Sequence, residues 1–154
     1  MTNDVKGKAL GVGGVFFRSP DPGRLAGWYR DTLGLEIENW GATHGTSFAP
    51  ETMPVNAFTV WSIFASDTKY FGDPRQSFMI NLVVDDLDAA LARVRAAGGK
   101  VVPEKEEHDF GRFGWIVDPD GNRVELWEPP EEIPEEMPEE MPGDMPGEMP
   151  EENE

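Results

Sequence analysis

The sequence predicts an α+β fold made of two βαβββ units, one over residues 9–64 and one over residues 77–128. Two observations favour this fold. A strand-like run, a helix-like run and three further strand-like runs follow one another twice along the chain. In both copies an aspartate precedes the helix and a glycine follows it, as helix caps do. Residues 65–76, between the copies, are polar and rich in turn-forming residues, which is typical of a connector.

The first unit opens with a strand-like apolar run over residues 10–19. A helix is expected at about 22–33, because Asp21 suits the N-cap, Pro22 the first helical position and Gly34 the end. Strand-like runs follow at residues 35–40, 45–48 and 56–64.

The second unit repeats this order, beginning with a strand-like run over residues 77–84. A helix is expected at about 86–97, with an apolar stripe of Leu87, Leu91 and Val94 at helical spacing. Strand-like runs follow at residues 100–104, 111–117 and 122–128. A turn at Asp118-Pro119-Asp120-Gly121 introduces the last of these strands, in which Arg123, Glu125 and Trp127 share one face and Val124 and Leu126 the other.

Most of the net charge lies in a C-terminal segment. The net charge is −17, and residues 129–154 contain 11 acidic residues and no basic ones. This segment repeats a four-residue pattern such as EEMP, and prolines at that spacing prevent a helix. Because dense like charge with few large apolar side chains cannot build a core, we expect an acidic Pro/Met-rich disordered tail. The alternative is a docking arm that uses its methionines. Residues 1–8 form a short lead before a single domain at 9–128.

The composition excludes several classes of protein. Outside the tail, 19 acidic and 13 basic residues remain, and this balance disfavours nucleic acid as a partner. The chain has no cysteine, so disulfides and thiolate ligands are excluded. No apolar run approaches the roughly 18 residues of a membrane span, and a secretory signal pattern is lacking. We therefore expect a cytoplasmic protein that binds neither nucleic acid nor membranes.

Two stretches, DPGRLAGWYRDTLGL and DPDGNRVELWEP, together with the doubled βαβββ order, resemble the vicinal oxygen chelate superfamily. That superfamily includes glyoxalases, extradiol dioxygenases, fosfomycin-resistance enzymes and bleomycin-binding proteins. The resemblance covers about residues 9–128. It implies that the paired units form a curved, cup-like mixed sheet with the helices outside and the site inside. It also implies a homodimer, since members usually pair and many complete their cups with the partner chain.

The resemblance also implies four metal-ligand positions inside the cup. In this sequence they fall on Gly14, Met79, a residue near Trp61, and Glu125. Glycine offers no side chain, and methionine is a soft ligand that suits copper(I) rather than zinc or magnesium. One carboxylate does not hold a divalent metal by itself. We therefore expect no metal and no other cofactor, although the superfamily often uses a metal.

Two histidines are the alternative source of metal ligands. His44 lies in GATHGTS and His108 in EEHDFGR, which are both loop-like. A lone histidine in a loop is usually exposed and solvated. The acidic run around His108 favours a solvated charged surface over a cation site.

Strand alternation suggests which side chains share the cup with Glu125. The candidate ligand-binding residues are Phe16, Arg18, Trp61, Met79, Asn81, Arg123 and Trp127. Aromatic walls with a few polar groups are typical of small-molecule sites. Two alternatives remain. Arg18, Arg123 and Glu125 could pair with one another at the rim or at a dimer seam, and Asn81 could make a structural hydrogen bond.

Three functions fit this cup. We expect foremost that the protein binds a small organic ligand without the usual metal, with Glu125 as hydrogen-bond acceptor or catalytic base. The first alternative is a glyoxalase-type lyase or isomerase in which Glu125 transfers a proton. The second is an antibiotic-sequestering protein of the bleomycin-resistance type, although arginines in the cup suit a cationic drug poorly. Desolvation would raise the pKa of Glu125 and a neighbouring arginine would lower it, and the sequence leaves this open.

Overall fold

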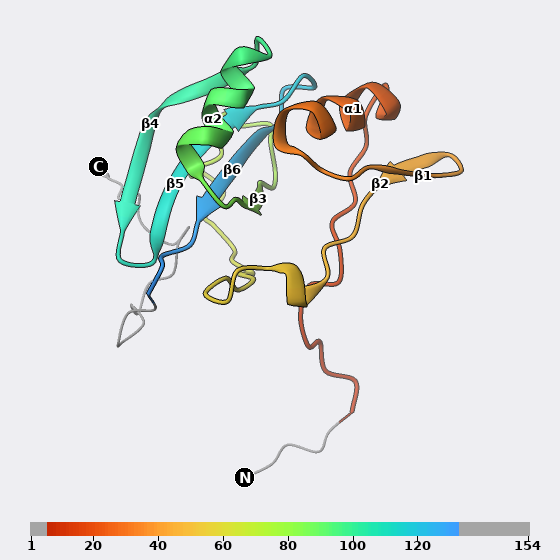
Figure 1. Cartoon of the computed structure of the whole chain (residues 1–154). Helices are drawn as coiled ribbons and strands as arrows, with labels where there is room; N and C mark the ends of the chain where they lie inside the picture. Colours follow the sequence, from red (N-terminus) through yellow and green to blue (C-terminus); the bar gives the residue numbers. More distant parts are fainter. Residues whose placement is uncertain (1–5, 133–154) are drawn as a thin grey trace.

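The computed structural model describes residues 6–132 of the chain. It is a mixed α+β structure, as the sequence predicts, with a four-stranded sheet, a separate two-stranded hairpin and two α-helices in the described part (Figure 1). The disordered tail is expected mainly over residues 133–154, which lie outside the described part. No helix in residues 6–132 has the length and hydrophobicity needed to cross a bilayer.

The second unit forms as expected. It consists of β3 (Ile80–Val83), α2 (Leu87–Ala96), β4 (Lys100–His108), β5 (Gly111–Val117) and β6 (Arg123–Glu128). The sheet order is β3-β6-β5-β4, in which β3 and β6 run parallel and the other neighbours are antiparallel. A parallel neighbour requires a crossover, and α2 provides it by packing on one face of the sheet (Figure 1). The turn at 118–121 joins β5 to β6, because the Asp118 carboxylate accepts from the backbone N–H groups of Asp120 and Asn122.

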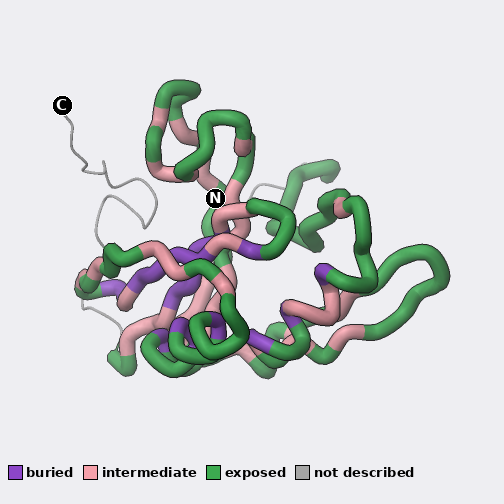
Figure 2. The backbone as a smooth tube through the Cα atoms, turned by 90° about the horizontal axis from the view of Figure 1, so that it is seen from above, coloured by how far each residue is buried: buried purple, intermediate pink, exposed green. Residues whose placement is uncertain are grey.

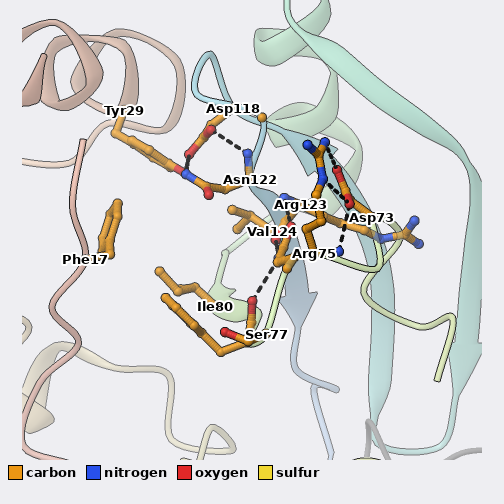
Figure 3. A pocket seen from close by; sticks show the side chains of 13 residues that line it. Phe17, Tyr29, Asp73, Arg75, Ser77, Ile80, Asp118, Asn122, Arg123 and Val124 are labelled. Atoms are coloured by element: carbon orange, nitrogen blue, oxygen red, sulfur yellow. Dashed lines mark hydrogen bonds and ion pairs between the residues drawn. The ribbon is translucent and has the colours of Figure 1, made fainter. Parts of the chain in front are cut away.

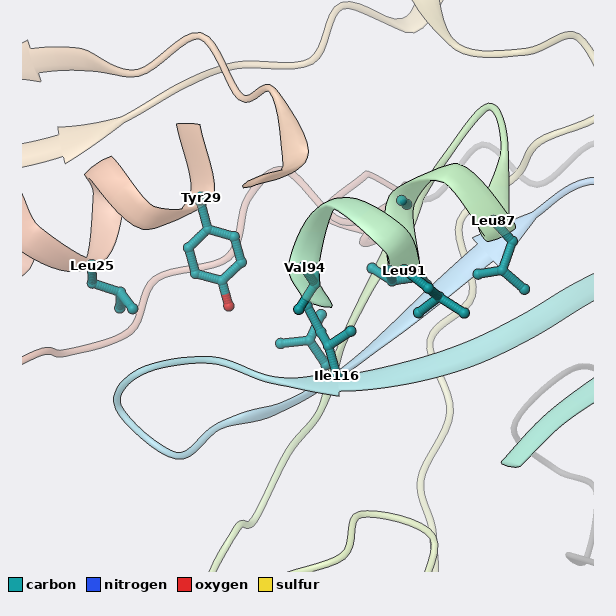
Figure 4. Close-up of a cluster of buried hydrophobic side chains, with 9 residues drawn as sticks. Leu25, Tyr29, Leu87, Leu91, Val94 and Ile116 are labelled. Carbon is teal, nitrogen blue, oxygen red and sulfur yellow. The ribbon is translucent and has the colours of Figure 1, made fainter. Parts of the chain in front are cut away.

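The main core lies between the two helices and this face of the sheet (Figure 4). The predicted stripe of α2 is buried in it, together with Val124 and Leu126 of β6. Helix α1 (Pro22–Leu33) adds Leu25 and Tyr29. Burial is concentrated in these elements, whereas much of the rest of the described chain is exposed (Figure 2). The alternation predicted for β6 therefore matches the structure on this face.

The first unit differs from the expectation. Its helix α1 spans the expected residues, with the Asp21 side chain accepting from the Arg24 N–H and Gly34 in the left-handed region at φ 75°. A short hairpin follows, formed by β1 (Glu38–Trp40) and β2 (Thr43–Gly45), and then a single 3₁₀ turn, η1 (Pro50–Thr52). The structure assigns no strand to residues 10–19 or 56–64. These segments have strand-like sequences, but they do not join the sheet in this chain.

The second face of the sheet is covered by residues that precede β3. Ala57, Phe58 and Tyr70 pack on a cluster of buried aromatic side chains contributed by β5, β6 and the turn between β4 and β5. The Asn56 side chain donates to the backbone oxygens of Pro130 and Glu131, at 2.6 and 2.8 Å. The chain around residues 56–70 thus closes over the face where the sequence places its candidate site.

Candidate functional site

Three side chains form a row across the middle of this second face. Asn81 of β3 is in register with Glu125 of β6, and Trp115 of β5 is in register with Glu125 from the other side. Side chains of paired residues in adjacent strands point to the same face. The sheet therefore places a carboxylate between an amide and an indole. We call the face that carries Phe113, Trp115, Glu125 and Trp127 the aromatic face.

Glu125 is buried and has a hydrogen-bond donor on each carboxylate oxygen. Only 3% of its surface is exposed. The Tyr70 hydroxyl donates to Oε2 at 2.5 Å, and Asn81 Nδ2 donates to Oε1 at 2.7 Å. Hydrogen bonds to an ionised acceptor are shorter and stronger than those between neutral groups. Both oxygens of this mid-strand carboxylate are thus satisfied inside the fold.

Burial nevertheless raises the pKa of the Glu125 carboxyl above its ordinary value of 4.5. The hydrogen bonds from Tyr70, Asn81 and the Trp115 indole act in the opposite direction, but desolvation is the largest influence. Loss of water disfavours the charged form, whereas donors favour it. The structure thereby settles the balance that the sequence left open, in favour of a raised pKa. The same contact and burial raise the pKa of Tyr70, whose hydroxyl stays protonated.

Arg123 lies beside this row and is anchored through its backbone. Gln76 accepts from the Arg123 N–H and donates to the Arg123 carbonyl, both at 2.8 Å. The guanidinium carbon lies 5.4 Å from the centre of the Trp115 ring, in a cation–π contact. Burial lowers the pKa of this guanidinium. Its Nε is buried and has no hydrogen-bond partner among the described residues.

Aromatic rings make up the rest of the face. Phe113 and Trp127 stack with centres 6.1 Å apart, and Phe58 lies 5.0 Å from Trp127. The Trp127 indole donates to the Phe110 carbonyl at 2.8 Å, which fixes the ring. Met79 and Val83 of the β3 region pack at the edge of this cluster. The face therefore offers apolar area around a single carboxylate.

A cavity of about 360 Å³ lies between α1 and the β3 edge of the sheet (Figure 3). Phe17 and Tyr29 line it on the helix side, and Ile80 and Val124 on the sheet side. The Tyr29 hydroxyl donates to the buried Asp118 carboxylate at 2.7 Å. The other lining residues are Asp73, Arg75, Gln76, Ser77, Phe78, Gly121, Asn122 and Arg123. Arg123 thus belongs to the surroundings of both the cavity and Glu125.

The structure brings together one part of the predicted site. Met79, Asn81, Arg123 and Trp127 lie around Glu125 or on the same face. Three other candidates lie on segments outside the sheet, and their side chains are exposed: Phe16 at 93%, Trp61 at 75%, and Arg18. Within this chain they are not assembled with Glu125, because the segments that carry them do not pair with the sheet.

Sequence reasoning missed two residues that touch the site. Trp115 could have been found, since alternation along GRFGWIV places it on the face of Phe113. Tyr70 had no comparable signal, because it lies in the connector and no periodicity predicts where a turn-rich segment will place a side chain.

The donor set around Glu125 does not fit a divalent metal. The groups that contact its oxygens are a hydroxyl and an amide N–H, which here donate hydrogen bonds rather than lone pairs. Among residues 6–132 there is no group of three or more His, Cys, Asp or Glu side chains that could hold a metal ion. His44 is exposed beside the first turn of α1, and His108 pairs with Glu106 at 3.1 Å at the end of β4. Neither histidine contributes to a group with Glu125 in the described structure.

Comparison with known proteins gives a family match over most of the chain. A model of the glyoxalase-like domain matches residues 14–127. A curated protein of Mycobacterium tuberculosis (strain CDC 1551 / Oshkosh), provisionally named a glyoxylase, CFP32, is 40% identical over 53 residues, which are 34% of this chain and 20% of that protein. An identical match is found in Mycobacterium bovis. The chain thus spans about a fifth of the length of the curated relatives it matches.

Solved structures similar to this chain include two bacterial proteins. TnmS3, an antibiotic binding protein from Streptomyces sp. CB03234, is 22% identical, with 71% of this chain and 88% of that chain covered and a TM-score of 0.43. A glyoxylase/bleomycin resistance protein/dioxygenase domain from Frankia sp. EAN1pec is 16% identical, with 80% and 100% covered and a TM-score of 0.47.

Proposed function

The chain belongs to the family of glyoxalase-like domains, and from this premise we propose that it binds a small organic ligand at Glu125 on the aromatic face, without a divalent metal. The observation that carries the proposal is the buried carboxylate itself. Glu125 stands on a wall of aromatic side chains, and its oxygens accept from Tyr70 and Asn81. Apolar surroundings with a few placed polar groups are what small-molecule sites require.

A metal-independent role follows from the chemistry of these groups. A divalent metal needs three or four ligand atoms that converge on it with lone pairs free. At Glu125 the neighbours are donors, so an organic group that donates a hydrogen bond suits the carboxylate better. The cationic side chain of Arg123 lies over the Trp115 ring and makes a positively charged drug a poor match for the same space.

The proposal is tested with the full chain by ligand screening and metal analysis. A thermal-shift screen of organic compounds is run with and without a chelator, on the native chain and on Glu125→Gln. We expect a compound that raises the melting temperature equally in both buffers and less in the variant. Stoichiometric metal in protein purified without chelators, lost in Glu125→Ala, would defeat the metal-independent role.

A second candidate function is proton transfer by Glu125, as in a glyoxalase-type lyase or isomerase. The raised pKa of this carboxyl favours it, because a base works best when its pKa is near the working pH. Exchange of a substrate C–H proton with deuterated water separates the two functions. Exchange that is lost in Glu125→Gln supports catalysis, whereas saturable binding without exchange supports the ligand-binding role.

A further inference from the structure

We infer that the ligand of the aromatic face is a hydroxylated aromatic compound, a phenol, that takes the place of the Tyr70 side chain. This inference rests on the proposed function and names the class of ligand. Tyr70 comes from the connector, outside the sheet that carries the site. Its side chain is itself a phenol, and the aromatic face already accommodates it.

The contacts of Tyr70 define a receptor for a phenol. Its ring lies 5.4 Å from the Phe64 ring at an interplanar angle of 19°, in a stacked arrangement. The edge of Trp115 meets it at 5.8 Å and 89°. Its hydroxyl donates to the buried carboxylate of Glu125 at 2.5 Å. Stacked and edge-on rings are the favoured aromatic geometries, and a carboxylate is a strong acceptor for a phenolic hydroxyl.

The segment that carries Tyr70 can move away without breaking the sheet. Residues 65–75 contain turns and bends but no helix or strand. The next fixed point is Gln76, which holds the backbone of Arg123. Before Gln76, the turn around Tyr70 is closed by hydrogen bonds between nearby backbone groups, such as the one from the Gly72 N–H to the Lys69 carbonyl. Turns of this kind open at low cost compared with paired strands.

Tyr70 also leaves a buried donor without a partner. Arg123 Nε has no hydrogen-bond partner among the described residues. Its guanidinium lies over the Trp115 ring, beside Glu125. A buried donor without an acceptor is costly. A phenol with an additional acceptor oxygen would satisfy a donor that Tyr70 does not reach, and this gives it an advantage over the tyrosine that it displaces.

The first experiment removes the tyrosine ring by substitution and supplies a free aromatic compound in its place. Tyr70→Ala is titrated with phenol and with toluene, which has the same shape with a methyl in place of the hydroxyl. A purely apolar hole would prefer toluene, because phenol must give up hydrogen bonds to water. We expect phenol to bind about tenfold more tightly, as one hydrogen bond to a carboxylate provides. Equal binding, a preference for toluene, or no binding of phenol would overturn the inference.

The second experiment keeps the fold intact and measures competition. Tyr70→Phe retains the ring but cannot donate to Glu125, so it should be displaced more easily than the native side chain. We expect phenol to bind Tyr70→Phe several-fold more tightly than the native chain. Equal affinities would show that phenol does not compete with Tyr70. This comparison decides the question alone if Tyr70→Ala does not fold.

The chain offers a matched control in its other tyrosine. Tyr29 also donates to a buried carboxylate, Asp118, but at the cavity beside α1. Tyr29→Phe should leave the affinity for phenol at the native value, and a gain equal to that of Tyr70→Phe would contradict the assignment to the aromatic face. If another class of compound binds in a Glu125-dependent way while phenol fails these tests, the phenol assignment falls and the proposed function stands.

Discussion

At the scale of single residues, Glu125 is a buried carboxylate on an otherwise largely apolar face. A buried carboxylate loses the stabilisation of water, and hydrogen bonds restore only part of it. Tyr70 and Asn81 supply those bonds, yet the pKa remains raised. An apolar residue at this strand position would pack against the same neighbours without that cost. The retention of a charge here is what an acceptor site for a ligand requires.

The raised pKa predicts how stability depends on pH. The unfolded chain titrates near the ordinary value of 4.5, while the folded carboxyl takes up its proton at higher pH. Between these two pKa values the folded state binds more protons, so the contribution of Glu125 to the unfolding free energy falls as pH rises. It is fully present below about 4.5 and is lost as pH rises through the folded pKa.

We expect the difference in unfolding free energy between the native chain and Glu125→Gln to shift in favour of the native chain as pH is lowered from neutral toward 4.5. Urea unfolding at a series of pH values measures it. Other carboxylates, including Asp73 with its pKa lowered to about 2, are present in both proteins and cancel in the comparison. A difference that does not change with pH would show that Glu125 is not desolvated in the folded chain.

Some residues of the site are positioned by regular strands, and others by the path of a connector. Alternation within a strand correctly grouped Glu125 with Trp127 and set Val124 on the opposite face. Pairing of β3 with β6 brings Asn81 to Glu125, and alternation along the two strands predicts the same grouping. Tyr70 depends on the path of a connector, and such a path is set by tertiary contacts that leave no periodic trace in the sequence.

At the scale of elements, the N-terminus of α2 shows how local signals and tertiary contacts combine. The Asp86 side chain accepts from the Ala89 N–H at 3.0 Å, as expected of an N-cap. Glu128, from the end of β6, accepts from the Leu87 N–H at 2.8 Å. The first turn of the helix is thus satisfied both by its own cap and by the strand that it covers.

We expect Asp86→Ala to lower the free energy of unfolding by about 1 kcal/mol, because a backbone N–H loses its acceptor. Chemical denaturation of the full chain measures this. Asp85→Ala is the matched control, since its side chain is exposed and is not the cap in the structure. It should change stability by less than about 0.5 kcal/mol. A larger effect at Asp85 than at Asp86 would show that the helix begins one residue earlier.

Some strand-like segments form strands in the structure and others do not, because a strand needs both a suitable sequence and a pairing partner. In the second unit, caps, alternation and the turn at 118–121 agree with a sheet whose strands lie close together along the chain. Residues 10–19 and 56–64 have comparable strand-like composition but lack strand structure. Alternation indicates that a segment suits a pleated surface, but a strand also needs a neighbour for its backbone N–H and C=O groups.

At the scale of the whole molecule, about half of the net charge lies outside the described residues. Residues 133–154 carry nine acidic and no basic residues, about half of the net charge of −17. We expect their deletion to change the melting temperature by less than about 2 °C, because the repeat has little apolar surface to bury. Solubility should fall with the lost charge. Calorimetry and a precipitation assay measure the two effects.

The position of the cut matters for that experiment. Pro130 and Glu131 accept hydrogen bonds from Asn56, so the chain is truncated after Glu132 rather than before it. A deletion from residue 131 serves as the control that removes one of these bonds. A large drop in melting temperature after the shorter deletion would show that the tail docks on the body.

The two edges of the four-stranded sheet differ in a way that concerns assembly. The β4 edge carries Pro103, Lys105 and several glutamates, and such residues discourage strand addition. The β3 edge, INLV, is short and uncharged, and Asn81 is its one polar residue. The segments of the first unit that lie outside the sheet expose Phe16 at 93%, Trp61 at 75% and Ile63 at 79%. An edge strand and exposed aromatic side chains on strand-like segments of one chain are complementary to the same features of a second copy.

We therefore predict a homodimer in which these segments of each copy cover the sheet of the other. Such a contact would pair the backbone of residues 10–19 or 56–64 and bury their aromatic side chains. Analytical ultracentrifugation at micromolar concentration should show two chains, and Trp61→Asp or Phe16→Asp should shift the equilibrium to monomer by tenfold or more, about 1.4 kcal/mol. Trp40→Asp is the matched control, because Trp40 is also exposed but lies on the hairpin, where its indole donates to Glu38. A native chain that sediments as a monomer, or a control that dissociates the dimer as strongly as Trp61→Asp, would show that the exposed segments do not form this interface.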